Sequence, residues 1–315
     1  MYSGIKGVTI QGDLSVEDFR HDLLKSIRGL VLENELLQAK TTYQIGGRAR
    51  FLVSPRDLDD LYQLNEVINR HAVPKFVLGG GANVLFSDDG FDGVVIHLDQ
   101  FDHFVVEGNH VRAGAGLILD ECIVGCLRKS LAGAERLSGI PSTLGGAVRM
   151  NAGAFNAEIS DYLLTVECMD FQGSHRILSR EEVGFYYRKA LAIRDCYILG
   201  ASFEFPSREL EELFKTRQEI LAQRHMRQPW QYPSAGSVFK RPPGHYAGKL
   251  IEDVGLKGKI IGRAQISSKH AGIIINLGGA RAADVVCLIR LAQGRVRERF
   301  GLELELEQEL VGFGN

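Results

Sequence analysis

Long apolar runs are absent from this sequence, and none approaches the roughly 18 consecutive apolar residues of a membrane-spanning helix. The first residues, MYSGIKGVTIQGD, contain no basic segment followed by an apolar one, which argues against a secretory signal. We therefore expect a cytoplasmic protein that does not bind a membrane.

Cysteine is scarce and unpatterned. The chain has five cysteines and no CxxC pair, and only Cys122 and Cys126 are close in sequence, in a predicted helix without a neighbouring histidine. Metal sites and disulfide frameworks use closer or paired spacings. We expect all five cysteines to be buried, reduced thiols, and we expect no metal.

The charge balance is nearly neutral. A formal net charge of -2, with 24% charged and 45% hydrophobic residues, is typical of folded domains. It excludes a wholly disordered chain and a wholly basic nucleic-acid binder. At roughly 150 residues per domain, the 315 residues predict about two domains.

Glycine is abundant: the 36 glycines make up about 11% of the chain, against an average of roughly 7%. Two stretches concentrate them, Gly79-Gly80-Gly81 and residues 139–155, GIPSTLGGAVRMNAGAF. The backbone N–H groups of such loops can bind phosphate, and two loops in one domain suggest a dinucleotide. A tight turn at the first and a connecting loop at the second are the alternatives. A strand follows the first loop where a Rossmann site has a helix.

Hydrophobic periodicity predicts a mixture of helices and strands. An amphipathic helix begins at Ser15 and ends before Gly29, and strands flank the Gly46-Gly47 turn within residues 41–53. Alternating Leu and Glu predict a strand over residues 302–307. Further helices are expected after Pro55 and over 119–129, 209–224 and 285–300, with three strands within 75–98 and others at 111–116, 164–171 and 196–205.

A basic segment runs from residue 215 to residue 263 and contains ten Lys and Arg residues but only three acidic residues. Such a local excess favours an anionic partner. Because no aromatic RNA-binding motif or helix-turn-helix pattern accompanies it, we expect a small phosphorylated ligand and no nucleic acid. A solvated basic face is the alternative.

An ordered set of motifs spans residues 36 to 312: TTYQIGG, VLGGGANVLFSD, VRAGAG, GIPSTLGGAVRMNAGAF, YYR, PSAGSVFK, AGKLIEDVGLKG, ISSKHAG and FGLELELEQELVG. With these motifs the chain resembles the UDP-N-acetylenolpyruvoylglucosamine reductases, the MurB family of peptidoglycan precursor synthesis. The span from Arg188 to Ser237 is too short for the extra substrate loop of longer members, so the chain resembles the shorter, type II form.

The resemblance implies an α+β fold. An FAD-binding domain of the vanillyl-alcohol-oxidase/PCMH type, with two α+β subdomains, is expected over residues 36–207. An N-terminal extension over 1–35 precedes it, and a C-terminal α+β substrate domain over 208–315 follows it. The implied protein is a monomer.

The implied cofactors are non-covalent FAD and NADPH. By position, the two glycine loops hold the diphosphate and ribityl region of FAD, and neighbouring residues line the rest. The implied contacts are Tyr43, Ile45, Gly46, Gly47, Gly79, Gly80, Gly81, Ala82, Asn83, Val84, Gly114, Gly139, Ile140, Pro141, Ser142, Gly145, Gly146, Ala147, Asn151, Gly153 and Ala154.

The family's reaction reduces the enolpyruvyl ether of UDP-N-acetylglucosamine enolpyruvate to UDP-N-acetylmuramate. Hydride passes from N5 of the flavin to the vinyl carbon, and negative charge accumulates on the substrate carboxylate, so cations and a proton donor are required. The matching positions imply that Arg188 stabilises this charge, Glu307 assists, and Ser237 donates the proton. The implied substrate contacts are Tyr187, Arg224, Arg227, Gln228, Lys240, Arg241 and His270.

Two other functions are compatible with the residues alone. One is an oxidase of the same flavin superfamily, in which oxygen reoxidises the flavin. The other is a non-catalytic flavin- or nucleotide-binding module whose basic segment binds an acidic partner. The combination of Arg188, Ser237 and Glu307 favours the reductase.

Overall fold

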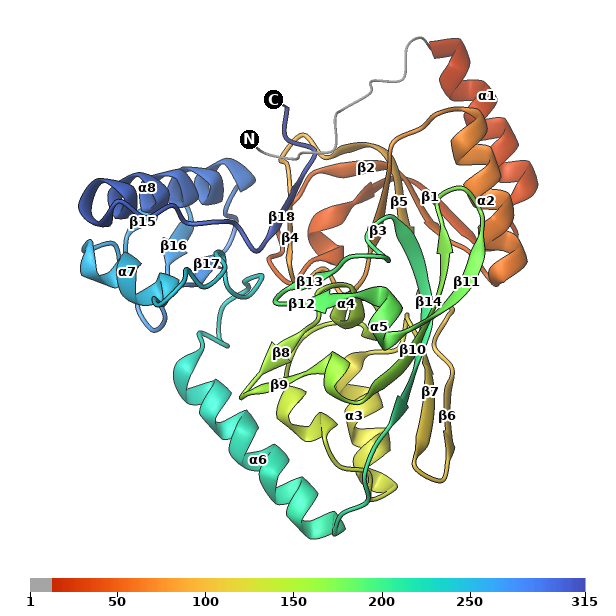
Figure 1. The fold of residues 1–315 in the computed structure, drawn as a ribbon. Helices are drawn as coiled ribbons and strands as arrows, with labels where there is room; N and C mark the ends of the chain where they lie inside the picture. The colour runs from red at the N-terminus through yellow and green to blue at the C-terminus, as the bar shows by residue number, and fades with distance from the viewer. Residues whose placement is uncertain (1–12, 315) are drawn as a thin grey trace.

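The computed structural model describes residues 13–314, which form two sheet-based units and a smaller C-terminal unit (Figure 1). The first unit comprises α1 (Asp13–Ser26), β1 (Leu30–Leu36), η1 (Leu37–Lys40), β2 (Arg48–Ser54), α2 (Leu58–Arg70), β3 (Lys75–Leu78), β4 (Val84–Phe86) and β5 (Phe91–His97). Its four-stranded sheet has the order β1-β2-β5-β3. Because side chains alternate along a strand, Phe51 of β2 packs with α1 and α2, whereas Leu52 joins a second cluster with Phe76.

The second unit is a five-stranded antiparallel sheet with the order β11-β10-β14-β7-β6. Its strands are β6 (Phe104–Glu107), β7 (His110–Gly114), β10 (Leu163–Asp170), β11 (His175–Ser179) and β14 (Cys196–Glu204). The remaining elements are α3 (Leu119–Arg128), η2 (Ala134–Leu137), α4 (Leu144–Arg149), β8 (Gly153–Ala154), β9 (Ala157–Glu158), η3 (Ile159–Asp161), α5 (Arg180–Val183), β12 (Phe185–Tyr186) and β13 (Lys189–Ala190). Helix α6 (Leu210–Arg227) packs against α3 and η2, with Leu213 in this unit's core.

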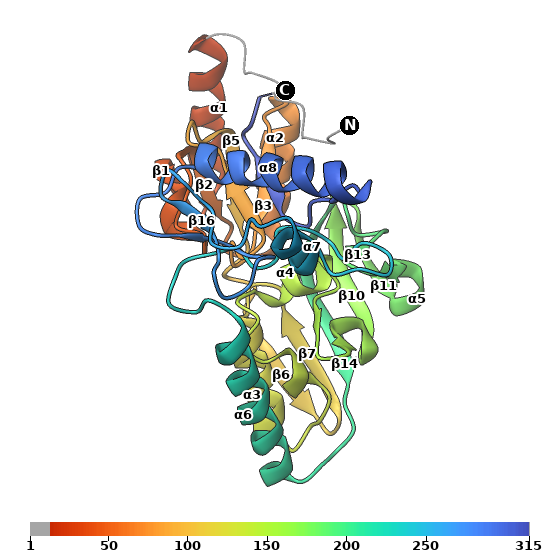
Figure 2. The ribbon, with the colours of Figure 1, turned by 90° about the vertical axis from the view of Figure 1, so that its left-hand side faces the viewer.

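The C-terminal unit contains α7 (Ala247–Asp253), β15 (Ile260–Ile261), β16 (Ala264–Ile266), β17 (Ile274–Asn276) and α8 (Ala282–Phe300). Seen from its own side, it lies in front of the region between the first two units (Figure 2). Tyr43 and Leu85 of the first unit belong to its core. The chain then returns as β18 (Glu309–Val311), which pairs in parallel with β4 and so brings residues near 307 beside the first glycine loop.

Most predicted elements are confirmed, and two predicted strands are wrong. No strand forms over residues 41–45; the antiparallel partner of β2 is β1, whose run of Glu33, Asn34 and Glu35 obscured the strand pattern. No continuous strand forms over 302–307, where only Leu306 makes a bridge, to Phe239. The alternation there is real, because Leu304 is buried and Glu303 and Glu305 are exposed, but alternation does not supply a pairing partner.

The cysteines are all free, and four of them are buried as expected. Cys287 is the exception, because it lies on an exposed face of α8. The domain boundaries at residues 35 and 207 stay predictions. Phe19 of α1 is fully buried in a core that it shares with β2.

Candidate active site

Arg188 occupies the two-residue turn between β12 and β13, with Tyr187 beside it. Two-residue hairpin turns of this kind favour positive φ angles. Arg188 accordingly has a φ of 56°, a conformation that is uncommon for a residue with a long side chain. Such backbone strain persists only where surrounding contacts hold it, and three hydrogen bonds of the guanidinium group provide them.

The Arg188 guanidinium group joins two distant parts of the chain. Its Nη2 donates to the carbonyl oxygen of Gly153 at 2.9 Å, and its Nη1 donates to that of Asn151 at 3.4 Å. Its Nε donates to Oε1 of Glu307 at 2.8 Å. Both side chains of this ion pair are largely buried, with exposed fractions of 19% and 12%.

Glu307 is positioned through its backbone as well. Its N–H donates to the carbonyl oxygen of Val238 at 2.9 Å, and its carbonyl oxygen accepts from Nδ2 of Asn83 at 2.9 Å. Burial raises the pKa of the Glu307 carboxyl group, and the positive charge of Arg188 opposes this rise. Through its backbone and its carboxyl group together, Glu307 therefore connects the first glycine loop, the Arg188 hairpin and the segment that carries Ser237.

Ser237 lies at an exposed position on the wall of a cavity. The adjacent Val238 donates its N–H to the carbonyl oxygen of Gly272 at 2.9 Å, and Ser237 forms an antiparallel bridge with Ile273. Among residues 13–314, no side chain hydrogen-bonds to the Ser237 hydroxyl group. The hydroxyl group is thus free to act on a molecule in the cavity.

One cavity of about 420 Å³ brings the three predicted catalytic residues together. Tyr187, Arg241 and His270, three of the predicted substrate contacts, also line it. Cationic side chains also line the cavity, and their positive charge suits an anionic ligand. The further lining residues are Phe239, Tyr246, Ala247, Gly248, Lys249, Glu252, Lys257, Lys269, Ala271 and Gly272.

His270 is neutral in this setting. Its Nδ1 accepts the N–H of Gly272 at 3.1 Å, which places the ring proton on Nε2. Burial lowers the pKa of His270, so the uncharged imidazole is favoured further. An Nε2–H group can donate a hydrogen bond to an oxygen of a ligand, but it is not a strong acid.

The two predicted cofactor loops touch each other. A Cβ atom on Gly79 would lie 2.6 Å from Oγ1 of Thr143, and one on Gly80 would lie 3.2 Å from Cα of Ser142. The close approach of the two loops therefore leaves little room for a side chain at either position, which favours glycine. At Gly47 and Gly114 the protein's own chain fills the space of a Cβ atom, at 2.3 Å and 2.0 Å, so those two glycines are explained by packing.

Buried polar atoms without partners surround the second loop. Among residues 13–314 these include Oγ of Ser138, Oδ1 of Asn151, and Nε and Nη2 of Arg224. Buried polar atoms in proteins are normally hydrogen-bonded. A hydroxyl group, an amide oxygen and a cation beside a glycine-rich backbone fit the ribityl hydroxyls and diphosphate of FAD.

Several residues predicted to contact the cofactor or the substrate do not line this cavity. Tyr43 and Ile45 are buried in the core of the C-terminal unit, and Lys240 forms an ion pair with Glu305. Arg224, Arg227 and Gln228, at the end of α6, do not line the cavity. The sequence prediction missed Tyr246 and Lys269, because Lys269 lies beyond the basic segment at residues 215–263 and a count of charges carries no information on Tyr246.

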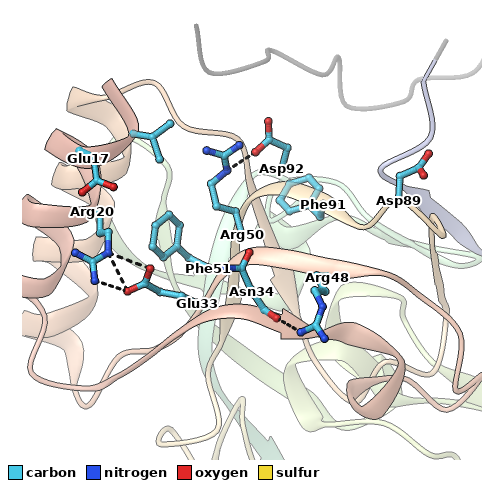
Figure 3. Close-up of a pocket in the computed structure, with 11 residues that line it drawn as sticks. Glu17, Arg20, Glu33, Asn34, Arg48, Arg50, Phe51, Asp89, Phe91 and Asp92 are labelled. Carbon is cyan, nitrogen blue, oxygen red and sulfur yellow. Dashed lines mark hydrogen bonds and ion pairs between the residues drawn. The ribbon is translucent and has the colours of Figure 1, made fainter. Parts of the chain in front are cut away.

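A second hollow, of about 470 Å³, is lined by residues of α1, β1, β2 and β5, among others (Figure 3), and it shares no lining residue with the first cavity. Its charged groups largely pair with one another: Arg20 with Glu33 at 3.0 Å, and Arg50 with Asp92 at 2.5 Å (Figure 3). Exposed ion pairs of this type contribute little to stability. We do not assign a reaction to this hollow.

In residues 13–314, no group of three or more His, Cys, Asp and Glu side chains is arranged to hold a metal ion. Within the same range, no helix combines the length and apolar character needed to cross a membrane.

Comparison with known proteins first defines the class. Residues 49–179 match the profile of the FAD binding domain family. Together with the two contacting glycine loops and the mixed helices and strands, this match identifies a flavoprotein and confirms the predicted α+β fold class.

Residues 228–311 match the profile described as UDP-N-acetylenolpyruvoylglucosamine reductase, C-terminal domain. A UDP-N-acetylenolpyruvoylglucosamine reductase of Caldanaerobacter subterraneus subsp. tengcongensis is 43% identical over 92% of this chain and 97% of the relative. One from Listeria monocytogenes is 40% identical over 89% and 94%. The crystal structure of the Thermus caldophilus enzyme, MurB, matches with a TM-score of 0.78 and 36% identity, over 90% of this chain and 99% of that one.

The chain belongs to the UDP-N-acetylenolpyruvoylglucosamine reductase family. It is an FAD-dependent oxidoreductase, and the resemblance inferred from its motifs is confirmed.

Proposed function

We propose that this protein reduces the enolpyruvyl double bond of UDP-N-acetylglucosamine enolpyruvate, with NADPH as the source of electrons. The observation that carries the proposal is the meeting of Arg188, Ser237 and Glu307 in one cavity. The proposed role is a step of peptidoglycan precursor synthesis, carried out by a cytoplasmic monomer.

When bound, FAD supplies the hydride that adds to the vinyl carbon. The residues near the two glycine loops, among them Ser138, Asn151 and Arg224, would hold it. All other requirements of the reaction concern charge and proton transfer, and these fall to the side chains of the cavity.

Arg188 offsets the negative charge that develops on the substrate carboxylate group. A fixed cation in a partly buried site stabilises such charge more than water does. Glu307 orients the guanidinium group through the Nε hydrogen bond, while Nη1 and Nη2 are held by the carbonyl oxygens of Asn151 and Gly153. The strained turn at residue 188 fixes the position of the cation before the charge develops.

Ser237 donates a proton to the carbon next to the carboxylate. A serine is a weak acid, but the carbanion-like intermediate is far more basic than a carboxylate and can take its proton. Cationic side chains on the same wall, including Arg241 and Lys257, favour the developing alkoxide. Arg241 also contacts Tyr187, whose Oη accepts its N–H at 3.4 Å, so both lie within one wall.

The visible absorption spectrum of the purified holoprotein tests the function under anaerobic conditions. NADPH should bleach the flavin band, and UDP-N-acetylglucosamine enolpyruvate should restore it. A band restored by oxygen but not by this substrate would indicate an oxidase. A protein that takes up no FAD would refute the proposal.

A further inference from the structure

Arg224 is a buried cation without a counter-charge. It lies in the last turn of α6 and is only 6% exposed. Among residues 13–314 its Nε and Nη2 atoms have no hydrogen-bond partner, and no carboxylate lies within ion-pair distance. A buried charge is costly unless it is paired, so the surroundings of Arg224 suit an anion that the chain itself does not contain.

The acid whose charge acts on Arg224 is Asp120, and its carboxylate already accepts hydrogen bonds from other groups. Asp120 accepts two hydrogen bonds from Arg217, at 2.9 Å and 2.6 Å, and a third from the N–H of Gly139 at 3.1 Å. Asp120 therefore forms its ion pair with Arg217, which lies seven residues before Arg224 on α6. Burial lowers the pKa of Arg224, and the charge of Asp120 only opposes this effect from a distance.

Arg224 packs directly against the second glycine loop. A Cβ atom on Gly139 would lie 3.1 Å from Cδ of Arg224 and 2.9 Å from Cδ2 of Leu221. On another side, the guanidinium group lies over the ring of Phe155 at 5.4 Å. The fully buried Ser138, next to Gly139, adds a hydroxyl group that also lacks a partner.

We propose that Arg224 binds a diphosphate group, and that this group belongs to the dinucleotide cofactor at the second glycine loop rather than to the nucleotide substrate. The sequence motifs implied a substrate contact for Arg224. The structure argues otherwise, because Arg224 does not line the cavity of Arg188 and Ser237 but supports the loop. Arginine suits this role, since its planar fork can make two hydrogen bonds to phosphate oxygens.

The proposal rests on the FAD-dependent function and is tested by binding rather than by turnover. Arg224→Met keeps an unbranched apolar stem and removes the charged guanidinium group. In the flavin-free protein, this variant should weaken FAD binding by about 10-fold to 100-fold, the usual range for a charged hydrogen bond. Binding of riboflavin, which has no phosphate, should be unchanged, and Arg224→Lys should give an intermediate value.

Thermal unfolding provides a second readout. Because an unpaired buried charge disfavours the folded state, Arg224→Met should leave the unfolding temperature of the apoprotein unchanged or raise it. The increase on adding FAD should become smaller. The matched control is Lys215→Met, which removes a positive charge from an exposed position on the same helix and should change neither quantity.

Three outcomes would overturn the proposal. Equal weakening of riboflavin and FAD would mean that Arg224 only maintains the loop. Unchanged FAD binding with a raised KM for the UDP substrate at saturating FAD would assign Arg224 to the substrate diphosphate. If Arg224→Met fails to fold, unaltered FAD affinity in Arg224→Lys would contradict the fork geometry. The wild-type protein's response to NADPH and substrate tests the function separately.

Discussion

Arg188 and Glu307 are 119 residues apart in sequence, and a 2.8 Å hydrogen bond from Nε to Oε1 joins them in the cavity. Arg188 comes from a hairpin of the second unit, whereas Glu307 comes from the returning C-terminal segment. Asn83 of the first glycine loop binds the backbone of Glu307 at 2.9 Å. The ion pair therefore depends on the correct packing of all three units.

Replacement of Arg188 should affect substrate reduction selectively. Arg188→Lys retains a charge but loses the planar fork that contacts Glu307 and Gly153. We expect the rate of flavin reoxidation by substrate to fall by roughly 100-fold to 1,000-fold, the usual effect of removing a group that stabilises a developing anion. Stopped-flow absorption measures this step. A variant that cannot retain FAD would show instead that Arg188 is structural.

Replacement of Ser237 should separate the two half-reactions. In Ser237→Ala, NADPH should still bleach the flavin at the wild-type rate, because that step needs no proton for the substrate carbon. Reoxidation by substrate should slow by roughly 100-fold to 10,000-fold. Equal slowing of both half-reactions would argue against Ser237 as the proton donor.

The titration of Glu307 should appear in the stability of the protein. Burial raises its pKa above the usual value of 4.5, so the folded protein retains this proton to a higher pH than the unfolded chain. The resulting stabilisation is complete below the unfolded pKa and is lost as pH rises through the folded pKa. The amide side chain that Glu307→Gln introduces does not titrate. The free energy of unfolding of this variant minus that of the wild type should therefore increase as pH rises above 4.5, and this difference should then become constant.

Urea unfolding of both proteins at a series of pH values measures this difference. Glu211→Gln, which replaces an exposed carboxylate on α6, is the control. If the free energy of unfolding of Glu307→Gln instead decreases relative to the wild type as pH rises, the attraction between Glu307 and Arg188 outweighs the cost of burying the carboxylate.

Motifs and periodicity predict the elements of this fold better than they predict its contacts. The strand-loop-strand order around Gly79 is readable because apolar runs are interrupted by glycine and aspartate. Strand β1 is not readable, since the polar residues Glu33, Asn34 and Glu35 obscure its pattern, and it forms a strand because it pairs with β2. Residues 41–45 carry a strand-like composition but have no partner strand.

In the candidate site, too, the motifs predict some residues, whereas the surroundings of others depend on the packing of the fold. The motifs point to Arg188, Ser237 and Glu307, and the structure brings them to one cavity. No local pattern distinguishes Arg224, which is buried beneath a loop, from Lys269, which lines the cavity. Both belong to a basic segment or its flank, and only the packing of α6 against the second unit separates their surroundings.

Asp60 should be important for the first unit. Its side chain is fully buried and accepts three backbone N–H groups, from Arg28, Gly29 and Arg56, each at 2.8 Å. These bonds join the chain entering β1 to the start of α2. In Asp60→Asn, one side-chain oxygen becomes an NH₂ group, so at least one of these donors loses its acceptor.

We expect Asp60→Asn to lower the free energy of unfolding by about 1–3 kcal/mol, the usual cost of an unsatisfied buried polar group. Asp59→Asn, at the exposed neighbouring position, should change it by less than about 0.5 kcal/mol. Urea unfolding followed by circular dichroism measures both. If the two variants are equally stable, water must satisfy the donors near Asp60, and this carboxylate does not hold the first sheet and α2 together.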